Sequence, residues 1–268
     1  MGTRRLRRAA REEQLSVVDH LDELRNRIVV AVLALVVAFG AAYGFHEQLI
    51  EFLEQPLPQR FQDSGLITLS PTEPFFTTLK VCFWTAIILA VPIWLYQVYA
   101  FVIPAVQDQS RRRMLAIVAG ASSLFLAGVA FGYYVVLPVA LNFLLNFGGD
   151  TFLTQVRAGE YFAFVTTLMF ASGLMFEVPV AMLALARIGV VTAEMFIKQW
   201  RIALVAIAAL AAVLPGGDPF SMLLLMAPQI VLYGLGILLA KRFGGPPLWD
   251  REAWAGDDDD PEDPPVTT

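Results

Sequence analysis

Long stretches without a charged side chain alternate with short charged segments along the chain. A helix needs about 17–25 predominantly apolar residues to cross the hydrocarbon of a bilayer, and most of these stretches reach that length. Six stretches, one of them interrupted by a single carboxylate, predict six transmembrane helices and therefore an all-α membrane protein. They cover residues 28–45, 81–107, 114–149, 161–186, 202–217 and 219–240.

The composition agrees with a membrane protein and excludes a soluble globule. Hydrophobic residues make up 57% and charged residues 16% of the 268 positions, against about 45–50% and 25% in soluble domains. The single cysteine, Cys82, excludes an internal disulfide, and His20 and His46 stand too far apart for a metal-binding motif. We therefore expect no metal and no cofactor.

Basic residues mark every second segment between the predicted spans. From the N-terminus onward the segments hold 7, 2, 3, 1, 3, 0 and 3 lysines and arginines, so 16 of the 19 lie in the first, third, fifth and seventh. Cytoplasmic loops carry the excess of Lys and Arg in membrane proteins. The pattern predicts that both termini are cytoplasmic and that the loops 46–80 and 148–160 lie outside.

The predicted spans differ in length. Residues 114–147 would form a helix of about 50 Å, which exceeds a bilayer, so we expect a bend at Pro138 and an external continuation. Residues 202–214 reach only about 20 Å and lead through a Pro-Gly-Gly-Asp turn into the last stretch. The last two spans are therefore expected to form a short hairpin.

Three regions follow from these patterns. Residues 1–15 form a basic N-terminal tail, and residues 16–243 form the membrane domain. The membrane domain opens with an amphipathic helix, residues 16–28, which leads into the first span. Residues 244–268 form an acidic C-terminal tail whose composition is typical of disorder.

Two pairs of glycines are spaced for close helix packing. Gly40 and Gly44 lie in the first span, and Gly128 and Gly132 lie in the third. The Gly-x-x-x-Gly spacing lets two helix backbones approach each other. Packing within the chain is the favoured interpretation of both pairs.

Few residues offer chemistry within the predicted spans. The chain lacks hydrolase, zinc-protease and nucleotide-binding motifs, so an enzyme is not expected. Glu177 is a carboxylate inside an apolar stretch, where an ionised side chain needs a partner, and no basic residue lies within a span. A partner in another chain or a trapped water is favoured. A proton-coupled secondary transporter using Glu177 is the alternative, although the chain shows no pair of matching halves.

Four motifs occur at the ends of the predicted spans or inside them. They are His20-Leu21-x-Glu23-Leu24-Arg25-x-Arg27, Pro74-Phe75-Phe76-Thr77, Tyr96-Gln97-x-x-x-Phe101-x-x-Pro104 and Phe176-Glu177-x-Pro179-Val180. Together they resemble the TatC family, the multi-span core subunit of the twin-arginine protein translocase, over about residues 15 to 243. The resemblance implies a cup-shaped bundle that binds twin-arginine signal peptides at its cytoplasmic face and helps to move folded proteins with the proton-motive force.

The resemblance also implies a setting for the chain. It suggests single-span partners of the TatA and TatB type, self-association in a larger complex and contact with membrane lipid. It places the chain in a prokaryotic cytoplasmic (inner) membrane. It gives no reason to expect a nucleic-acid partner.

Individual roles follow from the same resemblance. Glu23 and Arg25 match the acidic and basic positions of the N-terminal motif associated with signal-peptide recognition. Phe101 and Pro104 match the end of the second span beside the same site, and Glu177 matches the position associated with a partner's transmembrane helix. The external-loop residues singled out are Pro56, Phe75, Phe76 and Asp218.

One position departs from the family pattern. The family usually has a glutamate directly before the basic residues that follow the second span, where this chain has Ser110 before Arg111. The nearest carboxylate is Asp108, two positions earlier, which is about 7 Å along an extended chain. Either Asp108 replaces the missing glutamate, or recognition depends more on Glu23, or recognition is weaker in this chain.

Overall fold

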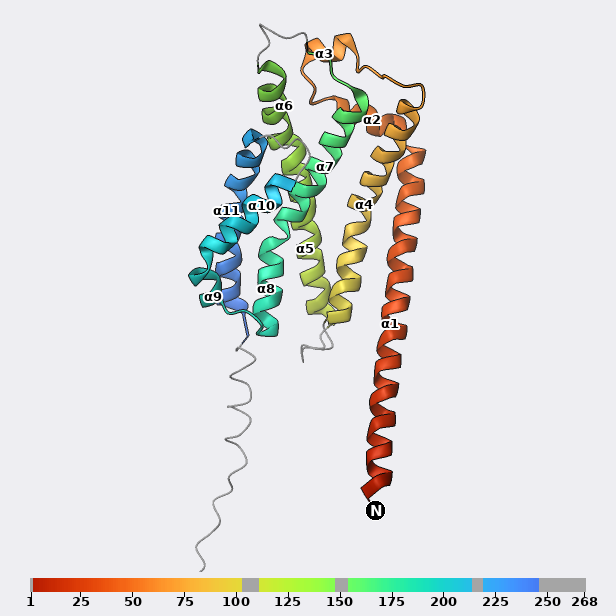
Figure 1. Ribbon diagram of the computed structural model, residues 1–268, viewed down its shortest axis with the longest axis vertical. Coiled ribbons are helices and arrows are strands. Elements are labelled where there is room, and N and C mark those ends of the chain that lie inside the picture. Colours follow the sequence, from red (N-terminus) through yellow and green to blue (C-terminus); the bar gives the residue numbers. More distant parts are fainter. Residues whose placement is uncertain (1, 103–110, 148–153, 214–218, 246–268) are drawn as a thin grey trace, which may run out of the picture.

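The computed structural model describes residues 2–102, 111–147, 154–213 and 219–245, and most of these residues are helical (Figure 1). Within these ranges, β pairing is limited to one parallel bridge between Ile67 and Arg157. The helices are α1 (Gly2–Gly44), α2 (His46–Glu54), α3 (Gln59–Ser64), α4 (Glu73–Val102), α5 (Arg111–Phe131), the π-helix η2 (Gly132–Val136), α6 (Leu137–Asn146), α7 (Ala158–Phe176), α8 (Val178–Ile188), α9 (Ala193–Lys198), α10 (Trp200–Val213) and α11 (Pro219–Phe243).

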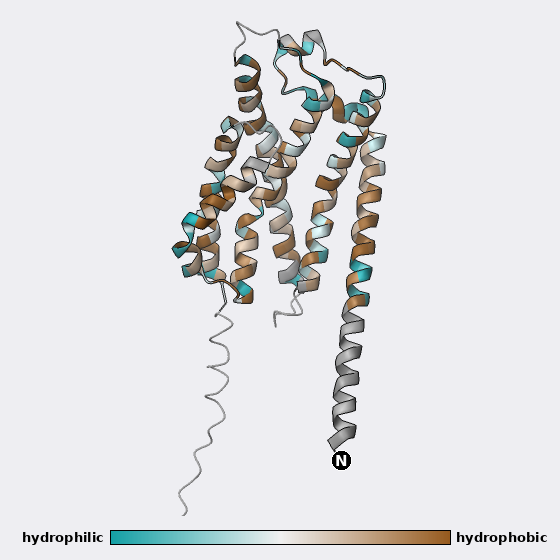
Figure 2. Cartoon of the chain, viewed as in Figure 1, coloured by the Kyte–Doolittle hydropathy of each residue, from teal (hydrophilic) through white to brown (hydrophobic). Residues whose placement is uncertain are grey.

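Five helical segments within the described residues are long and apolar enough to cross a bilayer. Hydrophobic residues run along all of them in Figure 2. The predicted fifth span, residues 202–217, corresponds to α10, whose 14 residues extend only about 21 Å. The prediction of an all-α membrane protein is confirmed, and α10 is short, as its sequence indicated. The five segments are Leu21–Gly44, Glu73–Phe101, Leu115–Asn146, Ala158–Ile188 and Pro219–Phe243.

The third of these segments is interrupted directly before Pro138. Regular α-helix ends at Phe131, the π-helix η2 follows, and α6 continues from Leu137 with Pro138 in its first turn. Proline has no N–H to bond to the carbonyl four residues earlier, so the regular hydrogen-bond ladder cannot pass through this position unchanged. The interruption falls where the sequence predicted a bend, and the predicted helical continuation is present.

Glycines allow α5 to lie directly against α7. A Cβ atom added to Gly128 would lie 2.7 Å from the carbonyl oxygen of Ser172, and one added to Gly132 would lie 2.7 Å from the Ser172 hydroxyl. This pair therefore packs within the chain, as predicted. Gly40 and Gly44 of α1 have no atom within 4 Å of such a Cβ, so the same spacing has no packing role between helices described here.

The remaining helices pack as neighbouring pairs. Figure 1 shows α1 at one edge of the molecule, where it packs mainly against α4, and α11 near the opposite edge, where it packs against α8. Both α4 and α5 pack against α7, which therefore lies between the two edges. We call the end at which α4, α8 and α11 finish the basic end, and the opposite end, with α2 and α3, the loop end. The basic end carries Arg27, Arg112, Arg187, Lys241 and Arg242.

Two tyrosine hydroxyls hold α2 against the bundle at the loop end. Tyr133 donates to the carbonyl of Phe52 at 2.5 Å, and Tyr161 donates to the carbonyl of Leu53 at 2.8 Å. Leu53 is itself buried in the largest hydrophobic cluster of the described residues, which joins α2 and α3 to η2, α6 and α7. The loop end is therefore an integral part of the hydrophobic core.

Candidate functional site

Glu23 lies at the basic end, where α1 passes the end of α4. One of its carboxylate oxygens, Oε1, accepts hydrogen bonds from Arg27 Nε at 3.1 Å and from Arg27 Nη2. The other oxygen, Oε2, has no hydrogen-bond partner among the described residues. The Glu23 side chain is 42% exposed and that of Arg27 is 19% exposed. Glu23 can therefore accept a further donor from solvent or from a ligand.

Arg27 also bonds to the last turns of α4. Its Nη2 donates to the carbonyl of Ala100 at 3.0 Å, and its Nη1 donates to the side-chain oxygen of Gln97 at 3.3 Å. Trp94 on α4 donates to the carbonyl of Ala31 on α1 at 3.0 Å, about one helical turn farther from the basic end. We call the group formed by Glu23, Arg27, Gln97 and Ala100 the α1–α4 site.

The structure brings only some of the predicted recognition residues together. Arg25 is exposed on α1, and Phe101 is half-buried directly after Ala100 at the end of α4. Pro104, Asp108 and Ser110 lie outside the described residues, and their predicted roles stay predictions. The i, i+4 spacing of Glu23 and Arg27 on one helix is compatible with their ion pair, but no sequence signal indicated that Arg27 also binds α4.

Glu177 lies at the junction of α7 and α8. Pro179 follows it in the first turn of α8, where a missing N–H is tolerated. The Oε1 atom of Glu177 is buried and has no hydrogen-bond partner among the described residues. Arg187, the nearest arginine in sequence, donates instead to the carbonyl of Phe243 at 3.2 Å. Glu177 is thus a carboxyl group within an apolar segment that keeps one oxygen available for a donor.

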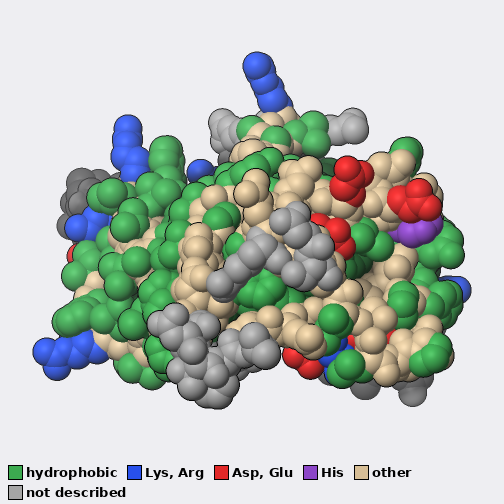
Figure 3. All heavy atoms as spheres, turned by 90° about the horizontal axis from the view of Figure 1, so that it is seen from above, with side chains coloured by type: hydrophobic (Ala, Val, Ile, Leu, Met, Phe, Trp, Pro, Cys, Tyr) green, Lys and Arg blue, Asp and Glu red, His purple; other side chains and the backbone are tan. Residues whose placement is uncertain are grey.

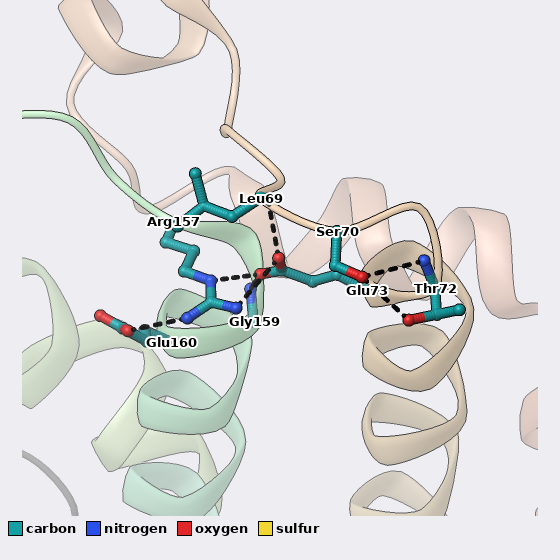
Figure 4. A network of polar contacts seen from close by, with 7 residues as sticks. All are labelled: Leu69, Ser70, Thr72, Glu73, Arg157, Gly159 and Glu160. Atoms are coloured by element: carbon teal, nitrogen blue, oxygen red, sulfur yellow. Dashed lines mark hydrogen bonds and ion pairs between the residues drawn. The ribbon is translucent and has the colours of Figure 1, made fainter.

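A second ion pair lies at the loop end, where it joins the loop before α4 to the segment before α7. It was not expected from the sequence. The carboxylate of Glu73 accepts from Arg157 Nε at 2.8 Å and from Arg157 Nη2 at 3.2 Å (Figure 4). It also accepts from the backbone N–H of Leu69 at 2.9 Å and of Gly159 at 3.2 Å. Beside it, the bridge at Ile67 pairs the loop before α4 with the strand-like segment before α7. We call this group the loop clamp.

Of the two charged residues of the loop clamp, only Glu73 belongs to a recognisable sequence pattern. Ser70 and Glu73 have the spacing of a capping box, which places a carboxylate near free N–H groups at a helix start. Arg157 lies 84 positions away, and no local pattern connects it to Glu73. The second acidic neighbour of Arg157, Glu160, is 3.5 Å away with a 78% exposed side chain and contributes little.

Acidic and aromatic side chains lie on the surface of the loop end. Figure 3, viewed from this end, shows acidic side chains gathered on one side of the molecule. Glu51 and Glu54 of α2 line a cavity of about 450 Å³ at this end, and burial together with the Glu51 charge raises the pKa of Glu54. The described residues contain no group of three His, Cys, Asp or Glu side chains placed to hold a metal ion.

The predicted external-loop residues are partly described. Phe75 and Phe76 are both more than half exposed, at 58% and 56%, and their rings touch edge to face with centroids 5.4 Å apart. An exposed aromatic pair at the end of a span is typical of a membrane interface. Pro56 is half-buried in the turn that follows α2, and Asp218 lies outside the described residues.

The helices, the apolar segments and the polar α1–α4 site together define a polytopic membrane protein with one polar site at its basic end and a clamped loop end. The family described as Sec-independent protein translocase protein (TatC) matches residues 19–228. The chain belongs to the TatC family.

Individual relatives agree with this assignment. The chain is 41% identical over 234 residues to the chloroplastic translocase protein TATC of Arabidopsis thaliana, covering 87% of this chain and 68% of that protein. It is 34% identical over 231 residues to TatC of Carboxydothermus hydrogenoformans, covering 86% of this chain and 94% of that protein. A crystal structure of the twin-arginine translocase receptor TatC superposes with a TM-score of 0.75 at 32% identity, covering 83% of this chain and 98% of that chain.

Proposed function

We propose that this chain is the receptor subunit of a twin-arginine protein translocase in a prokaryotic cytoplasmic membrane. In this proposal the basic end faces the cytoplasm and the α1–α4 site binds the paired arginines of a signal peptide. The observation that carries the proposal is the Glu23 carboxylate, which Arg27 holds on one oxygen and which has no partner among the described residues on the other. The similarity to a crystallised twin-arginine translocase receptor supports it.

The chemistry of the ligand suits an acidic site. A guanidinium offers a planar fork of N–H donors that matches a carboxylate, so arginine binds such a group better than lysine does. An exposed ion pair contributes only about 0–1 kcal/mol, so the apolar part of the signal must supply additional affinity from the membrane or from the helices. Arg25, Phe101 and Pro104 are proposed to complete the site, and Asp108 is proposed to supply acidity in place of the residue at Ser110.

We further propose that Glu177 binds the transmembrane helix of a single-span partner of the TatA or TatB type. A buried carboxyl oxygen without a partner among the described residues, placed within an apolar segment, supports an interaction supplied from outside the chain. Together with such partners and further copies of itself, the chain would move folded proteins by means of the proton-motive force. A proton-coupled transporter is not favoured, because the family match covers residues 19–228.

Co-purification tests the receptor proposal. A folded reporter carrying a twin-arginine signal should be captured by the full chain, and a reporter with both arginines changed to lysine should not. The Glu23→Ala variant should lose capture, while Asp22→Ala, which removes an adjacent exposed carboxylate, should retain it. Equal capture of the two reporters would contradict the receptor proposal and favour the transporter.

A further inference from the structure

The carbonyl of Ala100 lacks its regular α-helical donor. In an α-helix the carbonyl of residue 100 would accept from the N–H of residue 104, and position 104 is proline, which has no N–H. The described part of α4 runs to Val102, two residues after Ala100. The sequence at position 104 therefore removes the regular donor of this carbonyl, which can accept a donor from elsewhere.

Arg27 supplies the missing donor from α1. Its Nη2 lies 3.0 Å from the Ala100 oxygen, and its Nη1 lies 3.3 Å from the side-chain oxygen and 3.5 Å from the carbonyl oxygen of Gln97. The last turn of a helix carries a partial negative charge that favours a cation. Arg27 is also the less exposed member of its ion pair with Glu23. The guanidinium is therefore held by α4 on one side.

The same guanidinium holds Glu23 on its other side. Nε and Nη2 both donate to Oε1 of Glu23, and Nη2 is shared between Glu23 and the Ala100 carbonyl. Both donors converge on Oε1, which holds this oxygen in place, and Oε2 has no partner among the described residues. Through Arg27, Oε1 of Glu23 is thus linked to Ala100 of α4, about seventy positions away in sequence.

We propose that Arg27 is a positioning residue of the receptor: it bonds to the Ala100 carbonyl, whose regular helical donor Pro104 removes, and it holds Oε1 of Glu23 so that Oε2 can accept from the arginines of a signal peptide. This inference rests on the proposed receptor function. It assigns Pro104 an indirect role: the proline acts by withholding an N–H group from Ala100, and Arg27 then takes that acceptor.

Two other roles for Arg27 lead to different results. If Arg27 only joined α1 to α4, its loss would lower stability and would weaken the binding of every peptide equally, and Trp94 would still join the same helices through Ala31. If Arg27 instead blocked Glu23, its loss would strengthen the binding of a signal peptide. The positioning role requires that its loss weaken the binding of arginine-bearing signals selectively.

The test measures the dissociation constants of two synthetic signal peptides, one with paired arginines and one with paired lysines, for the purified full chain in detergent. Arg27→Gln should weaken binding of the arginine peptide about tenfold, because charge-assisted hydrogen bonds that orient the carboxylate are lost. Arg27→Lys should restore only part of that loss, since an ammonium group lacks the planar fork. Binding of the lysine peptide should change less than twofold in both variants.

Pro104→Ala provides an independent variant with every charge in place. The new N–H group would compete with Arg27 for the Ala100 carbonyl, so the arginine peptide should bind more weakly. Because a carbonyl oxygen has two lone pairs, the competition is incomplete, and we expect a loss of only about threefold. In the Arg27→Gln background the same change should have no further effect. Arg242→Gln, which removes one basic charge at the basic end, serves as the control and should bind both peptides normally.

The outcomes separate this inference from the receptor function itself. Tighter binding by Arg27→Gln, or unchanged binding by both Arg27→Gln and Pro104→Ala, would overturn the positioning role while the receptor function stands. If Arg27→Gln and Pro104→Ala weakened peptide binding additively when combined, the positioning role would also be overturned. If the wild-type chain bound the two peptides equally, both proposals would fail. Pro104→Ala keeps the test decisive should Arg27→Gln not fold.

Discussion

Gly128 lies where α5 and α7 are in direct backbone contact. A Cβ atom at this position would lie 2.7 Å from the carbonyl oxygen of Ser172 and 2.7 Å from Cγ of Phe176. Carbon atoms in ordinary contact are about 3.5–4.0 Å apart, so Gly128→Ala requires the two helices to separate or Phe176 to move. Moving Phe176 alone does not relieve the contact with the Ser172 carbonyl, because that oxygen belongs to the backbone.

The magnitude follows from two opposing effects. Overpacking a close helix contact costs about 1–3 kcal/mol. Replacing glycine by alanine within a helix contributes about 1 kcal/mol in the opposite direction. Gly120 in the same helix α5 is the matched control, because a Cβ there has no atom within 4 Å. We expect Gly128→Ala to be less stable than Gly120→Ala by about 1–3 kcal/mol.

The assay is equilibrium unfolding of the full chain in mixed detergent and SDS micelles, with helical content as the readout. The same variants should then be crosslinked to a partner helix through a residue placed near Glu177, which itself stays in place, because Phe176 directly precedes Glu177 and its displacement moves the carboxyl group. Gly128→Ala should lower both stability and crosslinking. Equal stability of the two alanine variants would refute the argument from close packing.

Three further predictions concern carboxylates. Glu73→Gln should speed proteolysis of the loop end, because an amide cannot accept all four N–H donors of the loop clamp, while Glu160→Gln should leave the rate unchanged. Glu177→Gln should retain crosslinking to a single-span partner and Glu177→Ala should lose it; equal loss in both would indicate a required negative charge. Asp108→Asn should weaken signal-peptide binding and Ser110→Glu should restore it, and unchanged affinity in both would remove this loop from the site.

Local patterns in the sequence predicted the helices and their interruption. Apolar stretches of sufficient length are visible without any knowledge of neighbours, and Pro138 affects its own helix through a missing N–H. The packing of Gly128 and Gly132 was also predicted correctly. At Gly40 and Gly44 an added Cβ has no atom of the described residues within 4 Å, because close packing depends on which helix lies opposite.

Only the contacts within one helix of the candidate site could be predicted from the sequence. The ion pair of Glu23 and Arg27 follows from their spacing on one helix face. The contact of Arg27 with Ala100 and the pairing of Glu73 with Arg157 join residues 73 and 84 positions apart. Such contacts depend on how the helices are arranged, which neither periodicity nor charge counting specifies.

The location of the bound arginine pair tests the central claim most directly. A photo-crosslinking residue is placed next to the two arginines of a signal peptide, and the crosslinked residues of the full chain in detergent are identified by mass spectrometry. We expect crosslinks to the α1–α4 site, near Glu23 and Gln97, and their loss when the peptide carries lysines. Crosslinks at the loop end, or equal crosslinking by the two peptides, would contradict the account.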